Sequence, residues 1–278
     1  MPSTLPLTIR EPSRGRLRLN LAEIWRYREL LGLIVWRDTV VVYKQSVAGI
    51  GWAVLRPLLA MAVISLVFGK LARLPSDGVP YPLFAFAALL PWNYFAGALG
   101  GASQSLVGAT HLITKVYFPR LILPLANTLQ GLVEFGVSLL VLIGLMLWYH
   151  ATLAVSWTLV LLPIFLALAM LTSFAVSLWL SPLMVRYRDV RLLLPFLTQI
   201  WMFLTPVAYS SSLVPPRWRW LYALNPMAGV VDGFRWALLG KAPPDWTALA
   251  LSGGIALAIL VAGLYYFRRA ERTMVDVI

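Results

Sequence analysis

The chain has 278 residues, of which 60% are hydrophobic and 12% are charged, with a mean hydropathy of +0.79. Soluble domains are about half apolar and about one quarter charged, so this composition excludes an ordinary soluble protein and indicates a membrane protein. The formal net charge is +12, but the basic residues lie outside the apolar runs, so we attribute them to membrane topology and anionic lipid headgroups rather than to nucleic acid.

Residues 1–20 are rich in proline and arginine and predict a disordered cytoplasmic N-terminus without a signal peptide. Residues 21–44 are amphipathic at the helical period, which predicts a helix that lies along the membrane surface. Its apolar arc contains Ile24, Tyr27, Leu31, Ile34, Val35 and Val42, and its polar arc contains Glu23, Arg26, Arg37 and Lys44.

Residues 45–278 are predicted to form one transmembrane domain with six spans. The spans are Trp52–Gly69, Leu83–Val107, Leu121–Trp148, Trp157–Met184, Leu192–Ala208 and Trp246–Phe267. With both termini in the cytoplasm, 16 of the 23 Lys and Arg residues fall on the cytoplasmic side, as the positive-inside rule requires. Small residues at Gly97, Gly100 and Gly101 predict close packing of the second span on another helix.

The segment Val207–Asp245 is too long for a tight turn and too aromatic for a solvated loop. Its prolines interrupt any continuous span, so we expect two short helices that dip into the outer leaflet, near Trp218–Leu224 and Met227–Leu239. The aromatic residues here are either interface anchors or an external gate that contacts sugars. The candidates are Trp218, Trp220, Tyr222 and Trp236.

A polar stripe runs along the third predicted span, where Asn127, Gln130 and Glu134 follow helical spacing. A charge at the depth of Glu134 is costly in hydrocarbon, so it should face protein or water. The stripe is therefore either the wall of a hydrated pathway or a satisfied polar contact within the bundle, with Asn93 or Gln199 as a partner. Arg56 is expected to lie too close to the cytoplasmic headgroups to pair with Glu134.

The sequence contains no motif of a nucleotide-binding loop, a serine nucleophile elbow or a zinc protease. Cysteine is absent, and neither His111 nor His150 has neighbours at metal-ligand spacing. We therefore expect a protein that is not an enzyme and that holds no metal or cofactor of its own.

The short basic stretch Gly108–Pro124 connects the second and third predicted spans on the cytoplasmic side. It is either an ordinary inside loop or the place where a soluble motor protein pushes on a membrane channel.

Several stretches, in this order and at these spacings, resemble the membrane subunits of polysaccharide-exporting ABC transporters, the ABC-2 type permeases that move O-antigen, capsule or teichoic acid. They are RDTVVVYKQSVAGIGWAVLRP at Arg37–Pro57, LLPWNYF at Leu89–Phe95, LITKVYFPRLILPL at Leu112–Leu125, RYRDVR at Arg186–Arg191, TPVAYS at Thr205–Ser210, NP at Asn225–Pro226 and ERTMVDVI at Glu271–Ile278.

The resemblance implies a homodimer in the bacterial inner membrane that pairs with two cytoplasmic ABC ATPase subunits, which bind the ATP and Mg²⁺. It implies a polyprenyl-diphosphate-linked polysaccharide as the substrate. It also makes the cytoplasmic hairpin the ATPase-coupling segment, with Thr110, His111, Leu112, Lys115, Tyr117 and Arg120 as candidates. The alternatives are an ABC-2 permease for a small drug or lipid and an intramembrane enzyme that acts on lipid-linked sugars.

Overall fold

The computed structural model describes residues 21–44, 51–150, 157–240 and 243–273, and every regular element in these ranges is helical. The predicted N-terminal tail at 1–20 lies outside the described residues, as does most of the link between the third and fourth predicted spans, at 151–156. The α-helices are α1 Leu21–Arg26, α2 Arg28–Lys44, α3 Gly51–Ile64, α4 Tyr81–Gly108, α5 Thr110–Lys115, α6 Ile122–Trp148, α7 Leu162–Arg186, α8 Asp189–Leu204, α9 Arg219–Ala223, α10 Pro226–Leu239 and α11 Trp246–Thr273.

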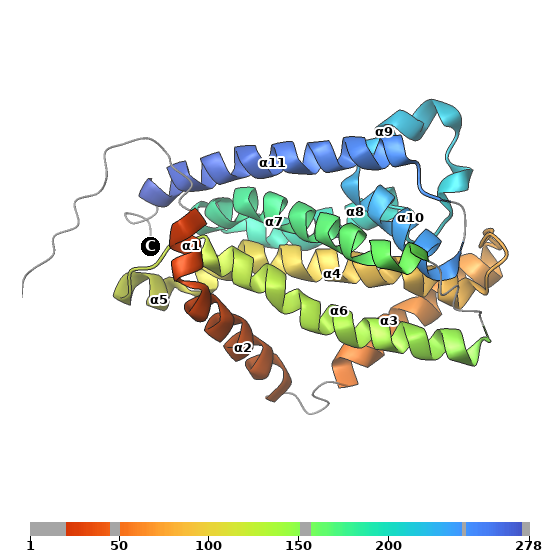
Figure 1. The fold of residues 1–278 in the computed structure, drawn as a ribbon, viewed down its shortest axis with the longest axis horizontal. Coiled ribbons are helices and arrows are strands. Elements are labelled where there is room, and N and C mark those ends of the chain that lie inside the picture. Colours follow the sequence, from red (N-terminus) through yellow and green to blue (C-terminus); the bar gives the residue numbers. More distant parts are fainter. Residues whose placement is uncertain (1–20, 45–50, 151–156, 241–242, 274–278) are drawn as a thin grey trace, which may run out of the picture.

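Five of the described helical segments are long and apolar enough to cross a membrane, and the long helices run side by side (Figure 1). They are Gly51–Leu71, Tyr81–Gly108, Ile122–Trp148, Thr158–Arg186 and Trp246–Arg272. The first continues α3 through the π-helical turn η1, Ser65–Leu71, and the fourth begins in the 3₁₀ turn η2, Trp157–Leu161. These five match five predicted spans, whereas the sixth, Leu192–Ala208, corresponds to α8, which has only 16 residues.

The centre of the bundle is α4, which is covered by α6 and α7 along its length and by α10 at one end (Figure 1). Most of its side chains are buried because it carries large apolar groups on nearly every side. Aromatic rings join it to its neighbours. Phe95 meets Trp201 of α8 edge to face at 4.9 Å, and Tyr94 meets Phe135 of α6 at 5.9 Å. Such pairs stabilise a core beyond the area that they bury.

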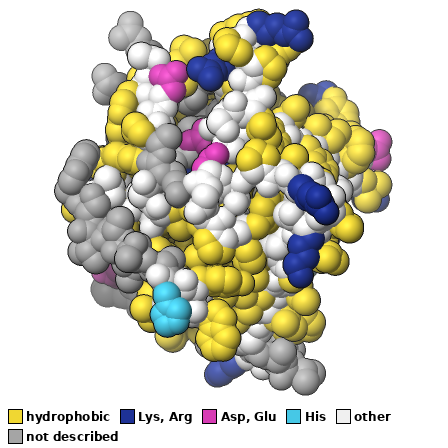
Figure 2. Space-filling model, turned by 90° about the vertical axis from the view of Figure 1, so that its right-hand side faces the viewer, with side chains coloured by type: hydrophobic (Ala, Val, Ile, Leu, Met, Phe, Trp, Pro, Cys, Tyr) yellow, Lys and Arg dark blue, Asp and Glu magenta, His cyan; other side chains and the backbone are white. Residues whose placement is uncertain are grey.

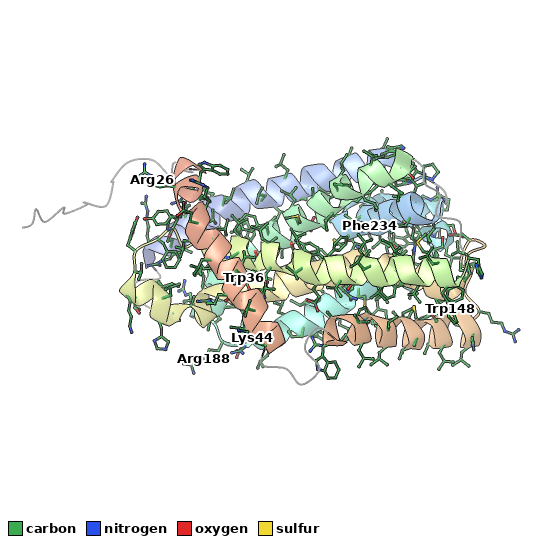
Figure 3. The ribbon with its side chains drawn as sticks, turned by 60° about the horizontal axis from the view of Figure 1, so that its bottom comes forward. Arg26, Trp36, Lys44, Trp148, Arg188 and Phe234 are labelled. Carbon is green, nitrogen blue, oxygen red and sulfur yellow. The ribbon has the colours of Figure 1, made fainter. Side chains whose placement is uncertain are left out.

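The two N-terminal helices pack across the bundle at the end where α5 lies (Figures 1 and 3). Ile34 of α2 is buried in the same apolar cluster as Phe118 and Phe267. The predicted apolar arc is confirmed, since Ile24, Tyr27, Leu31 and Val35 also pack against this cluster. The side chain of Val42 lies outside the described ones.

The outer surface of these two helices combines basic side chains with large aromatic ones. Arg26, Arg37 and Lys44 are exposed, as predicted for the polar arc, and the side chain of Glu23 is not described. Trp25 and Trp36 are exposed on the same side at 71% and 72%. This combination suits the boundary between lipid and water, where aromatic rings contact the acyl chains and basic side chains contact water and lipid headgroups.

At the opposite end of the bundle, the chain forms the two short helices predicted from the proline pattern, here α9 and α10 (Figure 1). Asn225 caps α10, its side-chain oxygen accepting from the Met227 amide at 3.1 Å, and Pro226 occupies the first turn. Gly240 ends the helix in the left-handed conformation, at φ 64°. Both features are typical helix boundaries.

Gly233 allows α10 to approach α7 closely, because a Cβ atom at this position would overlap the ring of the fully buried Phe165. We predict that Gly233→Ala destabilises the protein by about 1–3 kcal/mol, since an overpacked core forces its neighbours to move. The measurement is the apparent melting temperature of the detergent-solubilised protein. Gly136→Ala is the matched control, because nothing lies within 4 Å of a Cβ atom there. An equal melting temperature for both variants would contradict this packing.

Candidate functional site

The membrane-spanning part of the bundle contains a polar cavity of about 450 Å³ between α3, α4 and α6. Its apolar lining is interrupted by polar groups from all three helices. These are Arg56 of α3, Asn93 of α4, and Asn127, Gln130, Glu134 and Ser138 of α6. The predicted stripe on α6 therefore faces a polar position on α4 and a cation on α3.

One narrow face of α4 remains exposed although the rest of the helix is buried. Asn93, Gly97 and Gln104 are exposed along this face at helical spacing. We predicted that the glycines of this helix pack on a neighbour, and only Gly101 does so, because a Cβ there would lie 3.0 Å from the Asn127 side-chain oxygen. Around Gly97 and Gly100 there is open space to 4 Å. Of these three glycines, Gly97 and Gly101 line the cavity, and the open space around Gly97 adds to its volume.

The acid in this cavity has no partner within the described part of the chain. Glu134 is exposed and makes neither a hydrogen bond nor an ion pair with another described residue. Gln130 is half-buried and also makes no hydrogen bond with another described residue. The side-chain amide of Asn127 donates a hydrogen bond only to the Leu123 carbonyl of the same helix, at 3.1 Å. Of the two partners considered for Glu134, Asn93 lines the same cavity and Gln199 does not. Because an unpaired carboxylate is very costly in hydrocarbon, this face requires water or another polar surface.

Arg56 lines the same cavity as Glu134, on the opposite wall. Its depth relative to the headgroups, from which we predicted that it does not pair with Glu134, stays a prediction. Among the described residues, Arg56 and Glu134 do not form an ion pair. The Arg56 guanidinium instead lies 5.8 Å from the centre of the Trp52 ring. The cavity therefore presents one cation and one anion that are both free to meet a ligand or a second chain.

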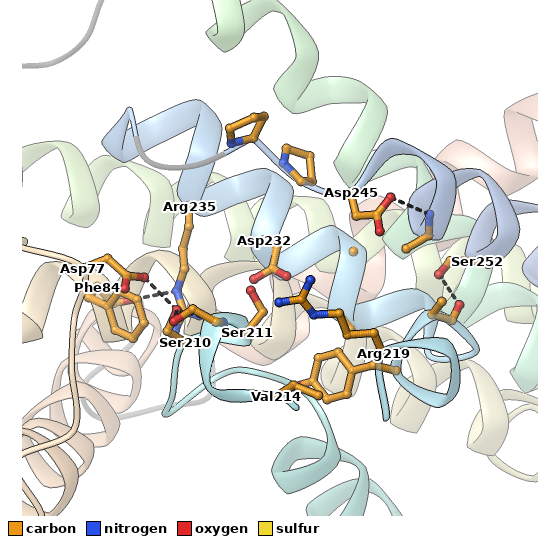
Figure 4. Close-up of a pocket in the computed structure, with 18 residues that line it drawn as sticks. Asp77, Phe84, Ser210, Ser211, Val214, Arg219, Asp232, Arg235, Asp245 and Ser252 are labelled. Atoms are coloured by element: carbon orange, nitrogen blue, oxygen red, sulfur yellow. Dashed lines mark hydrogen bonds between the residues drawn. The ribbon is translucent and has the colours of Figure 1, made fainter. Parts of the chain in front are cut away.

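A second polar cavity, of about 430 Å³, lies at the end formed by α9 and α10 (Figure 4). Figure 2 looks onto this end and shows Asp and Glu side chains around a hollow in its surface. The lining includes Asp77, Ser210, Ser211, Arg219, Tyr222, Asp232, Arg235, Asp245 and Ser252. The sequence analysis did not identify Asp232 or Arg235. An acid and a base three residues apart in an otherwise apolar helix were the available sign of a paired, buried site.

Arg235 is the structural centre of this end. The residue is 5% exposed, and its guanidinium donates to the carbonyls of Val207 at 2.8 Å, Tyr209 at 3.0 Å and Phe84 at 3.3 Å. It also lies over the Phe84 ring, 3.5 Å from its centre. One side chain thereby joins α10, the start of α4 and the segment that follows α8. Removing such a group leaves several buried carbonyls without a donor.

Burial shifts the pKa values of both charged residues on α10. Burial raises the pKa of Asp232 from 3.8 to about 6, although the nearby Arg235 opposes this shift. Burial likewise lowers the pKa of Arg235 to about 10, opposed by Asp232. At the mouth of the cavity, hydrogen bonds from Thr247 and Ala248 lower the pKa of Asp245. Asp232 is therefore the carboxylate here whose charge is least favoured by its surroundings.

The four aromatic residues predicted at this end separate into different environments. Trp236 is 9% exposed and packs edge to face on Trp246 at 5.4 Å, so it belongs to the core. Trp220 is 63% exposed. Trp218 and Tyr222 line an apolar cavity of about 680 Å³ between α7, α8 and α9, and Tyr222 also lines the polar cavity. The Tyr222 hydroxyl donates to that of Tyr209 at 2.8 Å.

The predicted cytoplasmic hairpin forms the short helix α5 at the opposite end (Figure 1). His111, Lys115 and Tyr117 are exposed, and Tyr117 is 74% exposed. Leu112 packs against the cluster around Ile34, and the Thr110 hydroxyl donates to the Val107 carbonyl at 2.9 Å.

Arg120 anchors the hairpin to the last helix. It donates to the Glu271 carbonyl at 3.1 Å and so ties the hairpin to the end of α11. The predicted residues thus divide into an exposed group, His111, Lys115 and Tyr117, and a group that fixes the hairpin on the bundle.

The structure shows no group of three or more His, Cys, Asp or Glu residues suited to a metal ion within the described ranges. Five apolar helices and an unpaired polar face between them define a multi-pass membrane protein of the channel or transporter class. The particular family follows from the sequence match, because residues 29–239 match the ABC-2 type transporter family. The chain belongs to this family.

Three relatives illustrate the similarity. The O-antigen export system permease protein RfbA of Myxococcus xanthus is 30% identical over 254 residues, which cover 90% of this chain and 96% of the relative. RfbA of Klebsiella pneumoniae is 25% identical over 264 residues, covering 95% and 99%. The polysialic acid transport protein KpsM of Escherichia coli is 22% identical over 227 residues, covering 80% and 86%.

We predict that stability near Asp232 depends on pH in a defined direction. Its pKa is raised on folding, so the folded state takes up a proton at a pH where the unfolded chain is still ionised. The wild type should therefore gain stability relative to Asp232→Asn as the pH falls through about 6. The measurement is the difference between the two apparent melting temperatures across this range. A difference that does not change with pH would contradict the buried state of this carboxylate.

Proposed function

We propose that this chain is the membrane-spanning subunit of an ATP-driven exporter for a polyprenyl-diphosphate-linked polysaccharide. The polar cavity between α3, α4 and α6 is the observation that carries the proposal. A sugar chain is covered with hydroxyl groups, so its passage through hydrocarbon requires a wall of hydrogen-bonding groups. The names of the relatives, two O-antigen export permeases and a polysialic acid transport protein, support a polysaccharide as the substrate.

In this proposal two copies of the chain face each other across the cavity and enclose the pathway. A single copy leaves Glu134, Asn93 and Gln104 exposed at the depth of the hydrocarbon. A second copy would turn two such faces into one water-filled channel and remove the cost of exposing them to lipid. The same polar lining disfavours the alternative of an apolar drug or lipid as the cargo.

We propose six spans with both termini in the cytoplasm of a bacterium and the body of the protein in its inner membrane. The sixth span is α8, whose 16 residues extend about 24 Å. Its apolar side chains, such as Leu192 and Phe196, are largely exposed, which suits contact with lipid. The helices α9 and α10 then lie in the outer leaflet as re-entrant elements. Residues 45–278 form one transmembrane domain, preceded by the interface helix and the cytoplasmic N-terminus.

Energy for transport would come from two copies of a cytoplasmic ABC ATPase that bind ATP and Mg²⁺. The docking site is the surface of the cytoplasmic hairpin formed by His111, Lys115 and Tyr117. Two contacts support a mechanical role for this hairpin. Leu112 packs on the cluster that holds α2, and Arg120 is bonded to the end of α11. A push on α5 therefore reaches both the interface helix and the last span.

The pathway is tested by filling the cavity. Gly97→Leu places a bulky side chain in open space on the exposed face of α4, so we expect a folded, inserted protein whose export falls to background. The measurement is glycan at the cell surface of a deletion strain that carries the variant. Gly144→Leu is the control, because this exposed glycine of α6 also has open space around it but does not line the cavity. Normal export by Gly97→Leu would refute the pathway.

The coupling role is tested by a charge reversal on the hairpin. Lys115→Glu changes an exposed side chain, so the protein should stay folded while the coupling of ATP hydrolysis to export falls by about 5- to 150-fold. The measurements are co-purification with the proposed ABC ATPase partner and export per ATP hydrolysed. Lys44→Glu at the exposed end of α2 serves as the control. If both variants couple like the wild type, the hairpin is an ordinary loop.

A further inference from the structure

The polar cavity at the end formed by α9 and α10 contains groups that the fold does not use. Arg235 is occupied by three backbone carbonyls, and Asp77 accepts a hydrogen bond from Ser210 at 2.7 Å. Asp245 caps α11, where it accepts from the amides of Thr247 at 3.0 Å and Ala248 at 3.2 Å. These three residues hold the walls of the cavity together. Arg235 has little hydrogen-bonding capacity left, whereas Asp77 and Asp245 each keep one carboxylate oxygen that accepts no hydrogen bond from another described residue.

Three other lining residues point into the open space (Figure 4). Asp232 comes from α10, Arg219 from α9, and Ser211 from the short 3₁₀ turn η3, Ser211–Leu213. Ser211 lies close enough to Asp232 to lower the pKa of its carboxyl, and Arg219 is exposed at the rim. Together they offer a carboxylate acceptor, a guanidinium donor and a hydroxyl that does both. They are brought together from three separate elements, as in a ligand site and not as in a local cap.

The charges identify the class of ligand. A free cation is disfavoured because Arg219 and Arg235 both line the cavity, and no metal-type cluster is present among the described residues. A phosphate is disfavoured because three aspartates line the same space. A sugar residue fits both signs, since its hydroxyls donate to a carboxylate and accept from a guanidinium. The ring of Tyr222 adds an apolar face, and about 430 Å³ is ample for one sugar residue.

We propose that this cavity is a sugar-binding subsite that holds one hydroxyl-rich residue of the glycan through Asp232, Ser211 and Arg219. The proposal rests on the proposed function, which makes this end of the bundle the outer one. The position of Asp232 supports it, because this half-buried carboxylate lines the cavity and its surroundings raise its pKa to about 6. The subsite gives the emerging chain a first contact outside the pathway between α3, α4 and α6.

The test uses the glycan that mild acid releases from the lipid extract of the host strain, titrated against the purified membrane complex. We expect Asp232→Asn and Arg219→Gln each to weaken its binding by about tenfold or more, because each removes a hydrogen bond to a charged group. Arg217→Gln is the matched control, since this neighbouring arginine is exposed and does not line the cavity. Asp232→Glu should keep part of the affinity.

The outcomes separate this proposal from the transport proposal. The variant Gly97→Leu fills the cavity between α3, α4 and α6, so it should lose export. It should bind the released glycan like the wild type, because the subsite lies elsewhere. Equal glycan binding by the wild type, Asp232→Asn and Arg219→Gln would overturn the subsite proposal but would not affect the transport proposal. Displacement of the glycan by inorganic phosphate at equal concentration would also overturn it, because the site would then be an anion site. Normal glycan export by Gly97→Leu would instead refute the pathway itself.

Discussion

The structure depends on one constraint, which is that polar groups in the membrane interior must meet water, protein or each other. Most side chains of the central helix α4 are apolar and buried, as this constraint requires. Along one face of the helix, however, Asn93, Gly97 and Gln104 are exposed. Across from that face, Glu134 and Gln130 of α6 are also unsatisfied within the described chain. In the proposed membrane position, this open polar face would need water or a second copy to cover it. The proposed dimer and the hydrated sugar chain would both supply polar surroundings for these exposed groups.

The two ends of the bundle are built for different tasks. At the hairpin end, α5 is exposed but tied to α11 through Arg120 and to α2 through the cluster around Ile34. At the opposite end, the buried guanidinium of Arg235 joins α10, α4 and the segment after α8. Both ends therefore contact α4 or its immediate neighbours. The hairpin and the cavity between α9 and α10 are thus both anchored on the helices packed around α4.

The sequence predicted those features that depend on local pattern. Hydropathy and length located five spans to within a few residues, and the helical period located the apolar arc of α2 and the stripe of Asn127, Gln130 and Glu134. Features that depend on tertiary packing could not be predicted from local pattern. Aromatic character does not specify depth, so Trp236 was grouped with surface residues although it is core. The shared cavity of Arg56 and Glu134, and the site around Asp232 and Arg235, arise from elements far apart in the chain.

The central claim is that the glycan touches the polar face of α4. The most direct measurement places a photo-crosslinking amino acid at Asn93 in cells that produce the glycan, with Val261 of α11 as the comparison. Asn93 lines the cavity, whereas Val261 is 59% exposed at a similar position along a helix that does not contribute to it. The account predicts that irradiation attaches glycan to the protein substituted at Asn93 and only lipid to the one substituted at Val261. Glycan attached at neither position, or equally at both, would contradict it.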